Sequence, residues 1–548
     1  MAALCALSQV LLLAARPPTA SHNQHKHLLL DSVLLSGACS SSQAPHLSPQ
    51  DPLSHQSSQT TATSSSTSSA EYFGGTGDHG SKSIHVGKSG YRNISSLPQE
   101  IMERVPPELV EGIAPYCDRS SLHSLCRVSR LFAACFQPFL YHNIMLSGSH
   151  AVDKLLRTVS TDPDVFGKYI RSLDITNPDG DLYKLLGHLV RARRWIETRY
   201  SPTLTAWLFD RFRLSMPQSD GYVTLLLVLS PNTERLRTDM RITVLSFWKD
   251  YALFSDLNSP TNVLDKLQSV EIASSVLPGA HPLGLTSLYP FFIFLQLRKL
   301  TLNNVYCTGA PLNQVTTPGM DPNMRARLGA MWASHSLEIL HLRSSTFGTA
   351  LLAITLQRSP KLHTLILESH HFRFPGVGNP GDLSLAELGA VLRRHVGSLR
   401  TLKVTMPETQ RWRVRDAPYC IGSLRGLMNL EVVAGHPECF LSRGMTVPRL
   451  RLQDILPASV RHVDLAQYDD GYGRGLVAEL FSLPRDRDQD PHSHHRFARL
   501  DRISVRGGGT FVHAAHEAAM MLGWELLEFE GCLPRSATWI RGERGLNE

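Results

Sequence analysis

The sequence has few of the groups on which common catalytic and metal sites depend. Its nine cysteines are an odd number and include no Cys-x-x-Cys pair, so neither a disulfide framework nor a zinc site is expected. No Gly-x-Ser-x-Gly motif is present, and no Cys/His pair can be assigned as nucleophile and base. The sequence therefore gives no ground for an enzyme. Free cysteines favour a reducing, intracellular compartment, which is the cytoplasm, the nucleus or both.

Long apolar runs and a strong charge of one sign are also lacking. The apolar start, Met1–Ala15, is too short to span a bilayer and has no basic n-region, so we expect no membrane segment. A signal or transit peptide is the alternative interpretation of this stretch. The net charge is +7, and its basic residues are scattered apart from small clusters at Arg191–Arg194 and Arg411–Arg415. This balance indicates solvated basic faces and does not favour nucleic acid as a partner.

Residues 1–95 are expected to form a disordered, low-complexity tail. From Ser21 to Tyr91 the composition is largely Ser, Thr, Gln, His and Gly, and Ser57–Ser69 is almost pure Ser, Thr and Gln. Such a segment buries too little apolar surface to offset the entropy lost on ordering.

A short helical module is predicted over residues 96–146. Pro106 and Pro107 suit a helix start, and Pro115 should end or kink that first helix. Asp118 or Ser120 is expected to cap a second helix. One face of that helix is formed by residues that recur every three or four positions, and Pro138 should end it. These residues are Leu122, Leu125, Ser129, Phe132 and Phe136.

The order of residue types in this module resembles an F-box. The pattern runs without a gap from Val105 to Phe132 and continues to Leu140-Tyr141. It consists of Val105-Pro106, Glu108-Leu109, Ile113, Tyr116, Leu122 with Leu125, Val128-Ser129-Arg130-Leu131-Phe132, and Leu140-Tyr141. Val105 and Cys117 stand where the family usually has Leu, and Pro115 is an intrusion.

The resemblance implies a substrate-recognition subunit of a Skp–cullin–F-box ubiquitin ligase, acting in ubiquitin-dependent degradation. The F-box would dock on a Skp-type adaptor and through it on a cullin, and the rest of the chain would bind an unknown substrate protein. No cofactor, catalytic residue or resident metal is implied. The adaptor-binding residues implied by the match are Pro106, Leu109, Ile113, Leu122, Val128, Phe132 and Leu140. Some of them are expected to be core residues of the module instead.

A six-residue pattern, apolar-x-x-apolar-x-apolar, recurs through the rest of the chain. From residue 267 onward its starts are 24 to 40 residues apart. We interpret each box as a short strand, with the apolar positions inward and the x positions on the other face or its edge. The boxes are 170–175, 267–272, 297–302, 337–342, 362–367, 399–404, 427–432, 460–465, 500–505 and 524–529.

Helix signals lie between these boxes, including a capping box at Ser384 and Glu387. A strand followed by a helix at a period near 30 residues resembles a leucine-rich repeat. The predicted fold class is therefore α/β: a small helical module, then an irregular leucine-rich-repeat-like solenoid over 263–535. Residues 147–262 are interpreted as a linker and degenerate first repeats. An ordinary α/β domain with a parallel sheet is the alternative.

Two segments rich in glycine or histidine are candidate sites. Asp470–Gly475 lacks the Gly-x-Gly-x-x-Gly spacing of a nucleotide loop and is interpreted as a turn. His492–His495 could bind metal but is interpreted as part of a solvated loop insertion at 485–495, with further insertions at 308–319 and 374–382. The main functional alternative is a non-catalytic leucine-rich-repeat scaffold or recognition protein outside the ubiquitin system, in which the helical module only caps the repeats.

Overall fold

The computed structural model describes residues 106–176, 182–214, 218–239, 265–274, 296–307, 336–373, 382–395, 397–408, 410, 420–441, 451–467, 476, 479–481, 483, 497, 499–507, 509–530 and 536–541. The predicted tail, the Asp470–Gly475 turn, the His492–His495 segment, the insertions at 308–319 and 485–495 and nearly all of the one at 374–382 lie outside the described residues.

The helical module consists of α3 (Pro107–Ile113), the 3-10 turn η2 (Ala114–Tyr116), α4 (Arg119–Cys126) and α5 (Arg130–His142). The prediction that Pro115 ends the first helix is confirmed, since α3 stops two residues before it. Asp118 caps α4, accepting a hydrogen bond from the Ser121 N–H at 2.8 Å.

Two predictions for this module are wrong. The second helix is broken into α4 and α5, because the Ser129 hydroxyl accepts from the Phe132 N–H at 3.1 Å and so starts a new helix. Pro138 lies inside α5 and does not end it. The missing N–H costs one helical hydrogen bond, which the burial of the Phe132 and Phe136 side chains of the same helix offsets.

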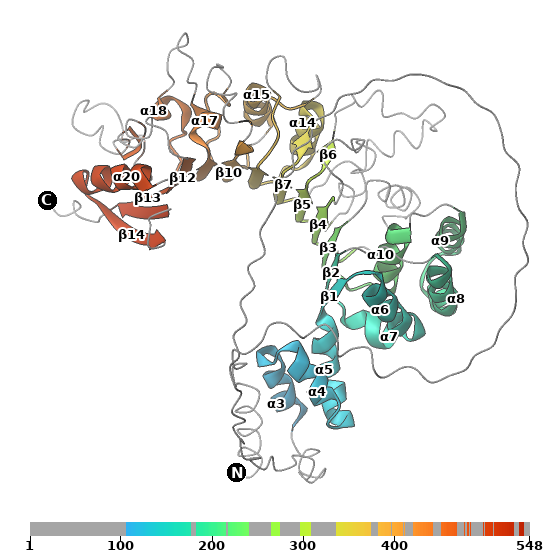
Figure 1. Cartoon of the computed structure of the whole chain (residues 1–548). Helices are drawn as coiled ribbons and strands as arrows, with labels where there is room; N and C mark the ends of the chain where they lie inside the picture. The colour runs from blue at the N-terminus through green and yellow to red at the C-terminus, as the bar shows by residue number, and fades with distance from the viewer. Residues whose placement is uncertain are drawn as a thin grey trace, which may run out of the picture. The chain divides into compact units, whose positions relative to one another are not determined.

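A mostly parallel sheet follows the module (Figure 1). Thirteen strands of the described part form it in the order β1-β2-β3-β4-β5-β7-β9-β10-β11-β12-β13-β15-β14. The parallel strands are β1 (Asn143–Ser147), β2 (Ser172–Thr176), β3 (Arg235–Asp239), β4 (Ser269–Ala273), β5 (Lys299–Asn303), β7 (Ile339–Arg343), β9 (Thr364–Glu368), β10 (Thr401–Val404), β11 (Val432–Gly435), β12 (His462–Gln467) and β13 (Arg502–Gly507). Two short strands, β6 (Tyr306–Cys307) and β8 (Thr346–Phe347), pair separately.

In the described part of the chain, helices connect several of the parallel strands and one connects β13 to β14, as strands of one direction usually require. They are α6 (Ser149–Thr161), α7 (Pro163–Phe166), η3 (Gly167–Tyr169), α8 (Leu182–Arg199), α9 (Pro202–Leu214), α10 (Gln218–Leu229), α14 (Thr349–Arg358), α15 (Leu385–His395), α17 (Pro437–Phe440), α18 (Leu452–Ile455) and α20 (Gly509–Met521). The predicted capping box starts α15: the Ser384 N–H donates to Glu387 at 2.9 Å and the Glu387 N–H donates to Ser384 at 3.2 Å. Within the described residues, no helix is both long and apolar enough to cross a membrane.

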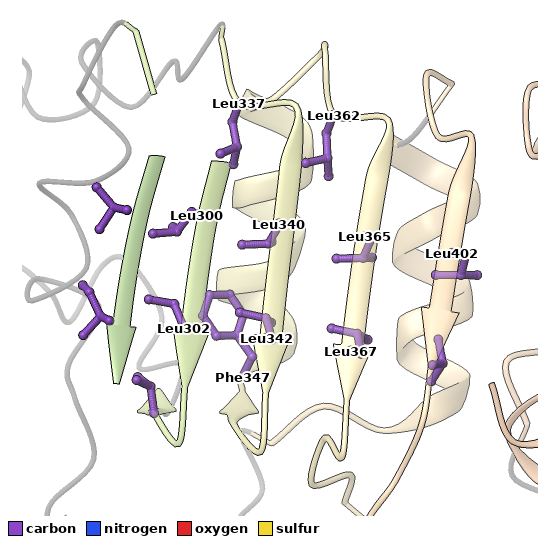
Figure 2. Close-up of a cluster of buried hydrophobic side chains, with 14 of the residues drawn as sticks. Leu300, Leu302, Leu337, Leu340, Leu342, Phe347, Leu362, Leu365, Leu367 and Leu402 are labelled. Atoms are coloured by element: carbon purple, nitrogen blue, oxygen red, sulfur yellow. The ribbon is translucent and has the colours of Figure 1, made fainter. Parts of the chain in front are cut away.

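The leucines of the six-residue boxes form the core between the sheet and its helices. Leu300, Leu340 and Leu365 occupy the same position in neighbouring strands and are fully buried. Figure 2 shows these side chains in a row, with a second row beside them that includes Leu302, Leu342 and Leu367. Helices α14 and α15 contribute Leu352 and Leu388 to the same cluster. The predicted boxes all coincide with strands of the sheet, apart from the one at 427–432.

The box at 427–432 is displaced by three residues. Val433, not Leu430, pairs with Leu402, so the strand is Val432–Gly435. The third inward position of the true box is Gly435, whose φ is +140°, and a Cβ there would overlap the carbonyl oxygen of Val404. The correct register could not be recognised from the sequence, because a glycine occupies a position where the pattern has an apolar residue.

The box at 524–529 forms a strand, but that strand does not pair with β13. β14 (Trp524–Glu530) pairs antiparallel with β15 (Ser536–Arg541), and β15 lies between β13 and β14. The register shifts between Leu526 and Glu528, and Leu527, which was expected to point inward, is half exposed.

Two of the parallel strands do not correspond to predicted boxes. β1 contains Ile144, which the prediction places in the helical module, and β3 contains Leu236, within the region 147–262 that is interpreted as a linker and degenerate first repeats. In β3 the flanking inward positions are Thr233 and Thr238, which are buried but polar, so the apolar pattern fails there.

Candidate docking site on the helical module

The module has a small apolar core of its own. Val110 of α3, Leu122 of α4, and Phe132 and Phe136 of α5 are buried, and the last two rings meet edge to face with centroids 5.5 Å apart. None of these residues belongs to the large contiguous core, which begins at Ile144. Two predicted adaptor-binding residues, Leu122 and Phe132, are therefore core residues of the module.

Three other predicted residues are exposed. Leu109 of α3 is 52% exposed and Val128, at the break between α4 and α5, is 53% exposed. Pro106, just before α3, is exposed as well, while Ile113 and Leu140 are half-buried. A module this small gains little stability from its own core, so these exposed apolar side chains make its surface a candidate for docking.

Tyr116 was part of the F-box pattern but was not counted among the adaptor-binding residues. It lies at the end of η2 and is 86% exposed, more than Leu109 or Val128. Its neighbour Pro115 is exposed too. The position of Tyr116 directly after Pro115 could have identified it. Pro115 ends α3, so the residue that follows lies outside that helix.

The module's thiols are suited to packing rather than to chemistry. Burial raises the pKa of Cys117, and Asp118 adds to the effect. Burial also raises the pKa of Cys126 and of Cys135. All three are neutral at pH 7 and act as small apolar side chains.

The end of the module contacts the beginning of the sheet. The Arg171 N–H donates to the His142 carbonyl at 3.0 Å, and the Tyr141 and Phe166 rings lie 5.3 Å apart. α5 leads directly into β1, the first strand. This continuity gives the capping interpretation of the module a structural basis.

The second candidate surface is the sheet face opposite the leucines, where side chains alternate with the buried ones. Arg237 lies between Asp174 and Glu271, at 3.5 and 3.4 Å. Farther along, the His341 Nε2 lies 3.0 Å from Glu368, whose other oxygen is 3.9 Å from Lys403.

The central pair on this face is a hydrogen bond rather than an ion pair. Burial lowers the pKa of His341 by more than the hydrogen bond to Glu368 raises it, so the neutral ring donates its Nε2–H. Burial alone would raise the pKa of Glu368, but the charge of Lys403 and the hydrogen bond from His341 outweigh it and lower that pKa.

No group of three or more metal-ligating side chains occurs in the described part of the chain. The histidines at 492–495 lie outside it. The interpretation of that segment as a solvated loop stays a prediction.

No protein-family model matches the chain, and no curated protein matches it either. Function is therefore inferred from the residues and contacts described above.

Proposed function

We propose that this protein is a substrate receptor of a Skp–cullin–F-box ubiquitin ligase. Residues 106–142 would act as the F-box, and the sheet domain, as a leucine-rich-repeat-like solenoid, would bind the substrate. The single observation that supports this best is the exposure of Leu109, Tyr116 and Val128 over a separate small core. These three residues belong to the pattern that resembles the F-box.

The proposed mechanism involves no bond chemistry by this chain. Docking on the adaptor would hold a bound substrate near the ubiquitin-charged conjugating enzyme. Proximity raises the effective concentration of substrate lysines, which is the main contribution that a receptor makes.

The alternative is a repeat scaffold capped by the helical module. The contact between His142 and Arg171 and the direct step from α5 into β1 favour it. A cap turns its apolar residues toward the repeat it covers and has no need of exposed ones. The exposed Leu109 and Val128 therefore favour a docking role.

Co-expression with a Skp-type adaptor, followed by pull-down, tests the proposal. Leu109→Asp places a charge in the proposed apolar contact and should abolish co-purification. Because Leu109 lies in the first turn of α3, an acidic residue there is compatible with the helix. The matched control is Val190→Asp, since Val190 is an exposed apolar residue on helix α8.

The proposal stands if wild type and Val190→Asp co-purify with the adaptor and Leu109→Asp does not. If the wild-type chain is folded and does not bind the adaptor, the module is a cap and the ubiquitin function is wrong.

A further inference from the structure

Positive charge gathers on the polar face of the central strands. Lys299 of β5, Arg343 of β7 and Lys403 of β10 share this face with a single carboxylate from the same strands, Glu368 of β9. The strand register aligns Asn303 with Arg343 and Arg343 with Glu368, so the side chains of neighbouring strands lie side by side.

Glu368 neutralises this group only in part, because one carboxylate faces three cations, and the charges of both Lys403 and Arg343 lower its pKa. It is already shared between the His341 ring at 3.0 Å and Lys403 at 3.9 Å. Lys299 and Arg343 are exposed, and no carboxylate of the described residues forms an ion pair with either within 4.0 Å. Arg237, three strands away from Arg343, shows the opposite arrangement, with a carboxylate on each side.

We propose that the polar face of β5, β7, β9 and β10 binds an acidic, extended segment of a protein, with Lys299, Arg343 and Lys403 as the contacts for its carboxylates. Naming that protein a substrate rests on the receptor function proposed above. Neighbouring strands are about 4.8 Å apart, so four strands span about 14 Å, the length of four or five extended residues.

Side chains between the charges favour a protein over a nucleic acid. Ile339 and Ile366 lie half-buried on the same face and offer apolar contact. Except for His341, the residues of these four strands on this face are not aromatic, so bases have little to stack on.

Fluorescence anisotropy with the full-length chain tests the proposal. The probe is a labelled ten-residue peptide in which glutamates alternate with apolar residues, and its control has glutamine in place of every glutamate. We expect the acidic peptide to bind at least about tenfold more tightly, and that preference to shrink as NaCl rises from about 50 to 300 mM.

Charge reversal locates the site. Lys299→Glu with Arg343→Glu should weaken binding of the acidic peptide by at least about tenfold, since attraction becomes repulsion. The matched control is Arg358→Glu, which reverses an exposed arginine at the end of α14, on the leucine side of the sheet. If the double reversal lowers the melting temperature, Lys299→Ser with Arg343→Ser removes the charge alone and should still weaken binding about fivefold.

Three results overturn the proposal: equal binding of the two peptides, equal weakening by Arg358→Glu, or displacement of the acidic peptide by a single-stranded oligonucleotide that binds more tightly. The last outcome would assign the face to nucleic acid. Adaptor binding is measured separately, so a failed adaptor pull-down with intact peptide binding rejects the receptor function and leaves this site standing.

Discussion

The hydroxyl of Ser345 accepts a hydrogen bond from the backbone N–H of Val305 at 3.0 Å, and both residues are buried. Each lies two residues after the end of its strand, Val305 after β5 and Ser345 after β7. The same hydroxyl lies 2.7 Å from the Arg343 carbonyl and 3.2 Å from that of Leu302. One side chain thus joins the turns that follow two neighbouring strands.

Ser345→Ala should lower the free energy of unfolding by about 1–3 kcal/mol, because the buried Val305 N–H loses its partner. Urea unfolding measures the change. Ser124→Ala is the control, since Ser124 bonds to Ser120 within the exposed face of α4. It should change stability by less than about 0.5 kcal/mol; equal losses in the two variants would contradict the bridging role.

His370 occupies the equivalent position after β9, but its effect is to make the stability of the fold depend on pH. It is fully buried, neither ring nitrogen has a hydrogen-bond partner among the described residues, and burial lowers its pKa to about 3. The folded protein keeps this ring neutral, while the unfolded chain binds a proton below its ordinary pKa of about 6.5. Stability is therefore lost as pH falls from about 6.5 towards 3, by up to about 1.4 kcal/mol per pH unit.

His370→Leu should flatten this dependence and raise stability by about 1 kcal/mol at pH 7, since it removes two buried polar atoms without partners. Urea unfolding at pH 7 and pH 5 measures both effects. His188, His341, His371 and His462 also have lowered pKa values, so the comparison is between wild type and variant. Parallel pH dependences would show that His370 titrates normally in the fold.

Two helical glycines should respond to alanine in opposite ways. In α8 a Cβ at Gly187 meets only the end of the Arg191 side chain, at 3.9 Å. Gly187→Ala should therefore add about 0.5–1 kcal/mol of stability through helix propensity. In α15 a Cβ at Gly389 would overlap the carbonyl oxygen of Ile421. Gly389→Ala should cost at least about 2 kcal/mol, and a stabilising result there would show that α15 packs differently.

The buried and exposed residues of the helical module should separate stability from adaptor binding. Phe132→Ala should unfold the module, because a core ring in so small a unit is worth about 3 kcal/mol or more. Val128→Asp should leave the far-ultraviolet circular dichroism unchanged and abolish adaptor pull-down. Loss of helix in Val128→Asp would place Val128 in the core instead.

The parallel strands could be predicted because their boxes repeat one physical requirement, two inward leucines per strand with a third before it. The pattern cannot be recognised in the sequence where a residue that is not a large apolar one occupies an inward position, as Thr233 and Thr238 do in β3 and Gly435 does in β11. The hairpin of β14 and β15 was missed for a different reason. Trp524–Phe529 satisfies the local pattern and forms a strand, but its neighbour in the sheet is β15, which lies later in the chain and inserts between β13 and β14.

The candidate docking residues could be found from the sequence, but the exposed ones could not be distinguished from the core residues of the module. Leu109 and Leu122 are both leucines in short amphipathic helices, and one is half exposed while the other is buried. Which of them faces the core depends on how α3 and α4 pack against α5, which starts at Ser129 with its own cap. A capping serine and an ordinary helical serine are identical in the sequence.

The antiparallel hairpin at the C-terminal end of the sheet limits where the parallel run of strands can lengthen. A new parallel strand cannot pair with β13, because β15 already occupies that edge and runs the other way. A duplicated strand-and-helix unit is therefore best accommodated within the parallel run from β1 to β13. There each new unit would find a parallel neighbour on both sides.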